Sequence, residues 1–232
     1  MRHYYSQYNT RQGKYTNAIE LRFIERAFAG MPKESLLLDI GGGGGRNAFP
    51  QALKGFQVVV TDIALPPLDY VMSRRHASIH AVLIPANIAT LPFSECRFDG
   101  GLCIQVPDLV ENEKNFFPAI SNYLKPNAPF VVTISNRMSY KYVIRLLLNR
   151  QATETKRKGT GQTRVYLFTA AEILNRAQNA GFKIRAMEGY NWIPFSKGSN
   201  SRWIHCASII EHRLMLQRIP FLSPWLIVCL QK

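Results

Sequence analysis

The sequence lacks both a membrane-spanning run and a secretory signal. Its longest apolar stretch near a terminus, Ile219 to Leu230, has 12 residues and is interrupted by two prolines and a serine. A membrane-spanning helix needs about 20 apolar residues. The first eight residues contain no apolar core of the kind that a signal peptide requires. We therefore expect a globular protein of the cytoplasm.

Cysteine is scarce, and no metal site is apparent. No two of the four cysteines have the spacing of a zinc site or a redox pair; they are Cys96, Cys103, Cys206 and Cys229. His76 and His80 are four residues apart, but the run that follows them is strand-like, which argues against a metal pair. We expect no metal, and unpaired thiols suit a reducing compartment.

Acidic residues are scarce in the C-terminal part. Residues 136–232 contain sixteen Lys and Arg but four Asp and Glu, whereas residues 36–135 are almost neutral. The net charge of the whole chain is +14. Two interpretations stay open: a solvated surface that favours solubility, or an acidic partner, which would be an anionic small molecule, a membrane surface or RNA.

Strand-like and helix-like segments alternate along the chain. Short apolar or β-branched runs predict strands at 35–40, 56–61, 79–84, 101–106, 129–135, 182–187 and 225–230. Helices are predicted at 20–28, from a cap at Asn47 to Gly55, at 115–124, and from a capping box at Thr169 and Glu172 to Gly181. This alternation predicts an α/β fold with a doubly wound, mostly parallel, seven-stranded sheet.

We expect one domain over residues 1–232. Residues 1–34 form its N-terminal helical segment. Two stretches interrupt the alternation, 136–168 after the fifth strand and 189–224 after the sixth, and we interpret them as lids over a substrate. The first includes the basic run Lys156 to Lys158. Ligands bind at the carboxyl ends of the strands in open α/β sheets, and both insertions are expected there.

Five consecutive glycines, Gly41 to Gly45, separate the first strand from the following helix. Glycine in such a turn lets the backbone approach a ligand closely. The dinucleotide fingerprint G-x-G-x-x-G fails, because Arg46 or Asn47 falls at its last position, and no Lys-Ser or Lys-Thr follows for a phosphate loop. What matches is an acid followed by alternate glycines, at Asp39, Gly41, Gly43 and Gly45.

This pattern resembles the class I methyltransferases, which use S-adenosylmethionine in a Rossmann-like fold. The resemblance covers about residues 36–184 and includes Asp62 at the end of the second strand, where an acid accepts ribose hydroxyls. Asn87 stands where the family has the acid that meets the adenine amino group, and its carbonyl is still an acceptor. The resemblance implies these cofactor-binding residues: Asp39, Gly41, Gly42, Gly43, Gly45, Asp62, Ile63, Asn87, Ile88 and Gln105.

Methyl transfer from a sulfonium is an in-line displacement that needs alignment and exclusion of water more than a catalytic base. The sequence accordingly shows no clear catalytic residue, and His205 is the one candidate general base that we name. Candidate substrate-binding residues are Arg137, Tyr140 and Trp192. Trp192 has an alternative role in packing the second lid onto the domain.

Two functions from different classes remain. The first is a methyltransferase that modifies an oxygen, nitrogen or carbon of a small metabolite, with an anionic metabolite as one alternative. The second is a basic protein that binds nucleic acid or a membrane on a methyltransferase scaffold, or an RNA methyltransferase. The Asp39, glycine and Asp62 pattern favours the first, and no RNA-binding appendage is recognisable. Gln105-Val106-Pro107-Asp108 also lacks the N-P-P-Y of enzymes that methylate exocyclic amines.

Overall fold

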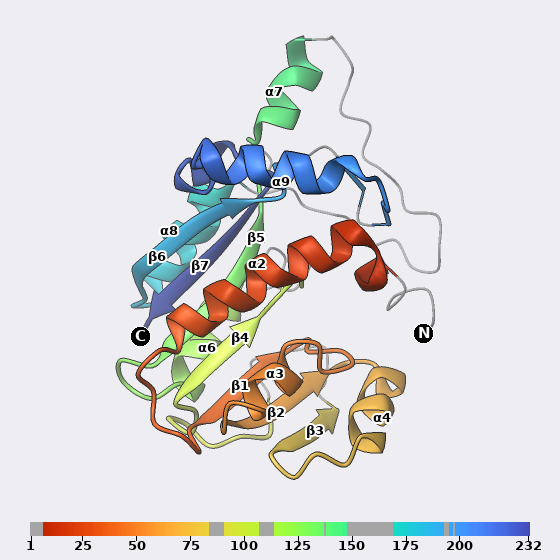
Figure 1. Cartoon of the computed structure of the whole chain (residues 1–232). Coiled ribbons are helices and arrows are strands. Elements are labelled where there is room, and N and C mark those ends of the chain that lie inside the picture. Colours follow the sequence, from red (N-terminus) through yellow and green to blue (C-terminus); the bar gives the residue numbers. More distant parts are fainter. Residues whose placement is uncertain are drawn as a thin grey trace.

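The structure is a computed structural model of the chain. It describes residues 7–83, 91–106, 114–136, 138–147, 169–192, 195–196 and 198–232. A twisted sheet crosses the molecule with helices on both of its faces (Figure 1).

The sheet has seven strands in the order β3-β2-β1-β4-β5-β7-β6. All neighbours pair in parallel except β7, which is antiparallel to both β5 and β6. The strands are β1 (Leu36–Ile40), β2 (Gln57–Asp62), β3 (Ile79–Leu83), β4 (Gly100–Cys103), β5 (Pro129–Ser135), β6 (Lys183–Tyr190) and β7 (Trp225–Gln231). The predicted α/β fold with a mostly parallel seven-stranded sheet is confirmed.

Two helix layers enclose this sheet. On one face lie α2 (Arg11–Ala27), α3 (Ala48–Ala52) and α4 (Leu65–Ser73), which share one apolar cluster with Val58 and Val60 of β2. The other face carries α6 (Phe116–Tyr123) and α8 (Ala170–Asn179), whose cluster includes Phe130 and Val132 of β5. Strand β1 is apolar at four of its five positions and buried at the last four, as expected of a strand covered by two helix layers.

Four of the remaining described elements follow β5 or β6 in sequence. They are α7 (Tyr140–Leu147), α9 (Trp203–Arg213) and the 3₁₀ turns η3 (Leu216–Arg218) and η4 (Pro220–Leu222). The 3₁₀ turn η1 (Gln7–Asn9) precedes α2 and packs on it. Helix α7 follows β5 and α9 follows β6, so both predicted insertions carry a helix (Figure 1). Their movement as lids stays a prediction. Among the described residues, no helix is long and apolar enough to cross a membrane.

The N-terminal helix is longer than predicted. It begins at Arg11, where Thr10 Oγ1 accepts a hydrogen bond from Gly13 N, and not at Glu20. The expected boundary was wrong because Gln12, Thr16 and Glu20 occupy the buried face, so the apolar period does not reach the true start.

Three other local details qualify the predictions. Asn47 precedes α3, but its side chain makes no capping hydrogen bond, so that cap was wrong. The fourth strand ends at Cys103 rather than at Val106. The capping box of Thr169 and Glu172 is confirmed, with both reciprocal hydrogen bonds present.

Candidate functional site

The candidate site lies where the strand order reverses. Strands β1, β2 and β3 succeed one another toward one edge, whereas β4 lies on the other side of β1. Ligands of open α/β sheets bind outside the carboxyl ends of the strands at such a point. The segments that leave β1 and β4 there are the glycine run and Gln105.

The glycine run forms a tight turn that only glycine can make. Gly41, Gly43 and Gly45 have φ values of +62°, +54° and +76°, a region that residues with a Cβ rarely adopt. At Gly42 a Cβ would lie 2.7 Å from an Asp39 carboxylate oxygen and from Val60. The turn therefore brings its backbone directly over the end of β1, with no side chain between it and a ligand.

Asp62 fixes this turn from the end of β2. Its Oδ2 accepts a hydrogen bond from Gly43 N at 3.0 Å, and its Oδ1 accepts one from Ala64 N at 2.9 Å. Ile63 beside it is exposed. Each carboxylate oxygen has a second lone pair, so Asp62 can hold the turn and still accept hydroxyl groups.

Asp39 is a buried carboxyl group without a hydrogen-bond partner among the described residues, and neither of its oxygens is paired. Burial raises its pKa to about 7, an effect that nearby Asp62 reinforces and the Arg46 guanidinium opposes. An unpaired buried carboxylate is costly. Asp39 lies directly beneath Gly42, and its role in binding a donor stays a prediction.

Glu20 is the centre of a buried polar network. Its Oε2 accepts a hydrogen bond from Arg46 at 2.6 Å, and its Oε1 accepts one from Gln105 Nε2 at 2.5 Å and one from the Tyr190 hydroxyl at 3.0 Å. These partners come from the glycine turn, the segment after β4 and the end of β6. Burial and the Glu20 carboxylate raise the pKa of Tyr190 well above its usual value, so its hydroxyl remains a donor.

Tyr8 closes this network from the N-terminal side. Its hydroxyl donates to Gln105 Oε1 at 2.9 Å, and its ring lies 4.4 Å from the Arg46 guanidinium carbon. Gln105 itself adopts a positive φ of 61°, and its N–H donates to Thr133 Oγ1. Such strain in a residue other than glycine is typical of functional sites, where the surroundings enforce it.

A second buried carboxylate, Glu211 of α9, joins the second predicted lid to α2. It accepts a hydrogen bond from the Tyr15 hydroxyl at 2.5 Å and one from Trp192 N at 3.4 Å. The rings of Tyr140 and Trp192 stack with 5.5 Å between centroids and 8° between planes, and the Tyr140 hydroxyl donates to the Trp192 carbonyl. The Trp192 indole N–H is buried and has no acceptor among the described residues.

The structure thus gathers Asp39, the glycines, Asp62 and Gln105 at one point of the sheet, and it brings Tyr140 and Trp192 together. Asn87, Ile88, Arg137 and the run Lys156 to Lys158 lie outside the described residues. His205 is exposed on α9, and its role as a base stays a prediction. Within the described part of the chain, no three His, Cys, Asp or Glu side chains form a cluster that could hold a metal.

Sequence analysis did not identify six members of the two networks: Tyr8, Tyr15, Glu20, Arg46, Tyr190 and Glu211. One signal was available for Glu20, because it falls between Ile19 and Phe23 on the stripe of α2 that faces the sheet. A charged residue on a buried stripe must be paired, which points to a buried cation nearby.

Comparison with known proteins agrees with this geometry. A family model described as "Methyltransferase domain" matches residues 38–132, which run from β1 through β5. Residues 38–132 therefore match a methyltransferase domain, which supports the resemblance to the class I, S-adenosylmethionine-dependent methyltransferases.

Two of the sequence relatives are ubiquinone biosynthesis O-methyltransferases. The one from Rickettsia canadensis is 25% identical over 154 residues, which are 66% of this chain and 64% of that protein. The one from Pseudoalteromonas translucida is 25% identical over 187 residues, covering 78% of this chain and 77% of that protein. The chain thus spans just under two thirds of the length of the first of these relatives.

Solved structures share the fold at lower identity. Phosphoethanolamine N-methyltransferase 2 of Haemonchus contortus superimposes with a TM-score of 0.61 at 19% identity, over 93% of this chain and 52% of that one. Geranyl diphosphate C-methyltransferase of Streptomyces coelicolor A3(2) superimposes with a TM-score of 0.63 at 12% identity, over 92% and 78%.

Proposed function

We propose that this protein is an S-adenosylmethionine-dependent methyltransferase that methylates an oxygen of a small molecule. The observation that carries the proposal is the unpaired, buried Asp39 beneath a glycine turn that leaves no room for a Cβ at Gly42. The two relatives named above, both O-methyltransferases, support oxygen as the acceptor atom. The four cysteines, all free, fit the cytoplasm as the proposed location.

In this proposal each group of residues at the site has one role. Asp39 receives the cationic amino group of the donor, the glycine turn accommodates its chain, and Asp62 accepts its ribose hydroxyls beside Ile63. The donor supplies an activated methyl group on a sulfonium. The chain's own residues align the acceptor with it and exclude water, which is where the rate enhancement of such a transfer arises.

We propose that the acceptor binds on the side of α7 and α9. Tyr140 and Trp192 form a stacked pair there, and Glu211 connects them to α2. A groove of about 530 Å³ lies between α2 and α9, and charged side chains of both signs line it, among them Arg22, Glu188 and Glu211. The excess of sixteen Lys and Arg over four Asp and Glu in residues 136–232 supports an anionic acceptor over a neutral one.

Replacing Asp62 by Ala tests the donor site. The variant loses the hydroxyl acceptor and the two backbone hydrogen bonds that hold Gly43 and Ala64. We expect affinity for S-adenosylmethionine to fall by about 1.5–3 kcal/mol, as for hydrogen bonds to a charged group, measured by calorimetry. Asp62→Asn retains one acceptor and should lose less. Asp69→Ala, an exposed acid on α4, is the matched control, and an equal loss there would contradict the assignment.

Replacing Trp192 by Ala tests the acceptor side. If the indole lines the acceptor pocket, kcat/KM for the acceptor should fall at least about tenfold while the melting temperature and donor affinity stay unchanged. If Trp192 only packs α7 onto the domain, the cavity should cost about 3–5 kcal/mol of stability and reduce every activity together. A large drop in melting temperature would therefore contradict the assignment of Trp192 to the acceptor pocket.

A further inference from the structure

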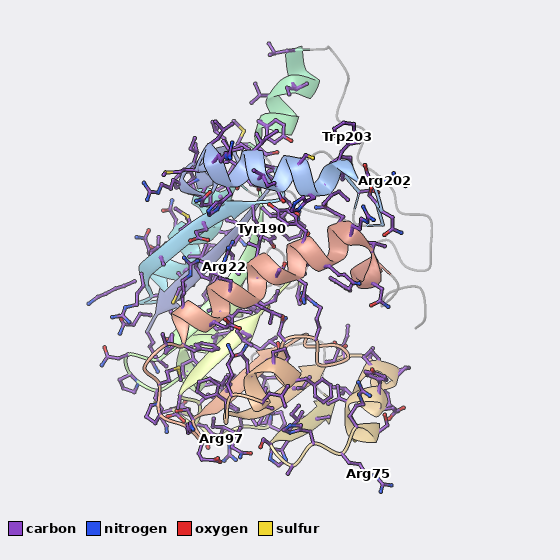
Figure 2. All side chains as sticks on the ribbon, in the orientation of Figure 1. Arg22, Arg75, Arg97, Tyr190, Arg202 and Trp203 are labelled. Atoms are coloured by element: carbon purple, nitrogen blue, oxygen red, sulfur yellow. The ribbon has the colours of Figure 1, made fainter. Side chains whose placement is uncertain are left out.

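The outer face of α9 is apolar where a soluble helix is ordinarily polar. Trp203, Ile210 and Leu214 are 72%, 56% and 63% exposed, and they recur at i, i+7 and i+11. That spacing places them on one side of the helix. Figure 2 shows Trp203 at the N-terminal end of α9, pointing away from the sheet and from α2.

The apolar surface continues past the end of this helix. Four further large side chains of η3, η4 and the residues beside them are 45–51% exposed: Met215, Ile219, Phe221 and Leu222. Turn η3 packs on both α9 and β6, and η4 packs on β6, so these turns are held in place beside the helix. We call the surface formed by these seven exposed apolar side chains the α9–η4 face. Exposed apolar surface that is gathered in this way marks an interaction site.

The charges of this face have one sign. Arg202, Arg213 and Arg218 are exposed among the apolar side chains. Glu211 is the sole acidic residue between positions 195 and 232, and it is buried against Tyr15 and Trp192. Tryptophan and aliphatic side chains interleaved with arginine, without exposed carboxylates, are the composition of a surface that lies in the headgroup region of an anionic bilayer.

We propose that the α9–η4 face docks on an anionic lipid bilayer. The apolar side chains enter the interface between headgroups and acyl chains, and the three arginines pair with lipid phosphates. Figure 1 shows α9 and α7 at the same end of the molecule, remote from α3, which follows the glycine turn, so a bilayer on this face leaves that turn free. The docked face adjoins the groove between α2 and α9, whose lining includes Ile209 and Arg213.

Vesicle flotation tests the proposal with the whole chain. We expect the parent to float with vesicles of phosphatidylcholine and phosphatidylglycerol and not with phosphatidylcholine alone, and added salt should weaken binding. The triple variant Trp203→Ser, Ile210→Ser, Leu214→Ser should bind about tenfold more weakly. The double variant Arg213→Gln, Arg218→Gln should lose a similar factor.

Two variants on other surfaces are the controls. Leu53→Ser removes an apolar side chain that is 79% exposed beside α3, and Arg97→Gln removes an exposed charge from the end opposite α9 (Figure 2). Both should float like the parent. Three results would overturn the proposal: no flotation of the folded parent, an equal loss in the controls, or a parent dimer that the triple variant converts to a monomer without any vesicle binding.

Discussion

Replacing Glu20 by Ala is expected to lower the free energy of unfolding by about 3–5 kcal/mol. The carboxylate is fully buried and holds Arg46, Gln105 and Tyr190. Its removal leaves the mostly buried guanidinium of Arg46 without its anion and two neutral donors without their acceptor. Breaking one half of a buried pair costs far more than the pair contributes in net terms, because the remaining charge stays desolvated.

For a chain of this length the loss corresponds to a decrease of about 6–20 °C in melting temperature, which thermal unfolding measures directly. Glu25→Ala is the matched control. Glu25 lies on the same helix and pairs with Lys54 at 2.5 Å, but both side chains are more than 40% exposed, so its loss should cost at most about 1 kcal/mol. Equal losses of stability in the two variants would mean that the buried contacts of Glu20 contribute no more than an exposed ion pair, which would contradict the prediction.

Replacing Asp39 by Asn is expected to separate stability from donor binding. Burial raises the pKa of Asp39 to about 7 from an ordinary value of 3.8, so the folded state binds a proton that the unfolded state releases between about pH 4 and 7. The stability of the free protein should therefore fall as pH rises through that window. The asparagine variant should lack this decline and be the more stable protein above pH 7.

The same substitution should weaken donor binding, although it stabilises the free protein above pH 7. A cationic amino group on Asp39 favours the ionised carboxylate, so S-adenosylmethionine should bind about 10- to 100-fold more weakly to Asp39→Asn. At pH 6 the parent should release about one proton on binding, measured by calorimetry in buffers of different ionisation enthalpy. Binding that is independent of pH in the parent, together with unchanged affinity in the variant, would remove Asp39 from the donor site.

Sequence patterns predicted the strands well because each strand is short, buried and limited by a clear turn. Pro129 to Ser135 coincides with β5, and Thr169 and Glu172 form the capping box before α8. The residues that we propose for the donor site could be grouped from the sequence, because Asp39, the glycines and Asp62 are local to two strand ends. Their contacts in the fold follow from strand adjacency alone.

The two polar networks could not be predicted from the sequence, for a physical reason. Glu20 meets Tyr190 across 170 positions of sequence and Arg46 across 26, and no local period encodes such a pairing. Glu211 meets Tyr15 across 196 positions. Other buried polar residues concealed the first turns of α2, because Gln12 and Thr16, which both donate to Asn191, occupy positions where the apolar period predicts apolar side chains.

The central claim is that the glycine turn and its two carboxylates bind S-adenosylmethionine, and a single calorimetric titration tests it. The purified chain should bind S-adenosylhomocysteine, the product left by methyl transfer, saturably and with about one site per chain, while NAD at the same concentrations should give no binding heat. Absence of binding by folded protein, or NAD binding as tightly as the product, would contradict the account.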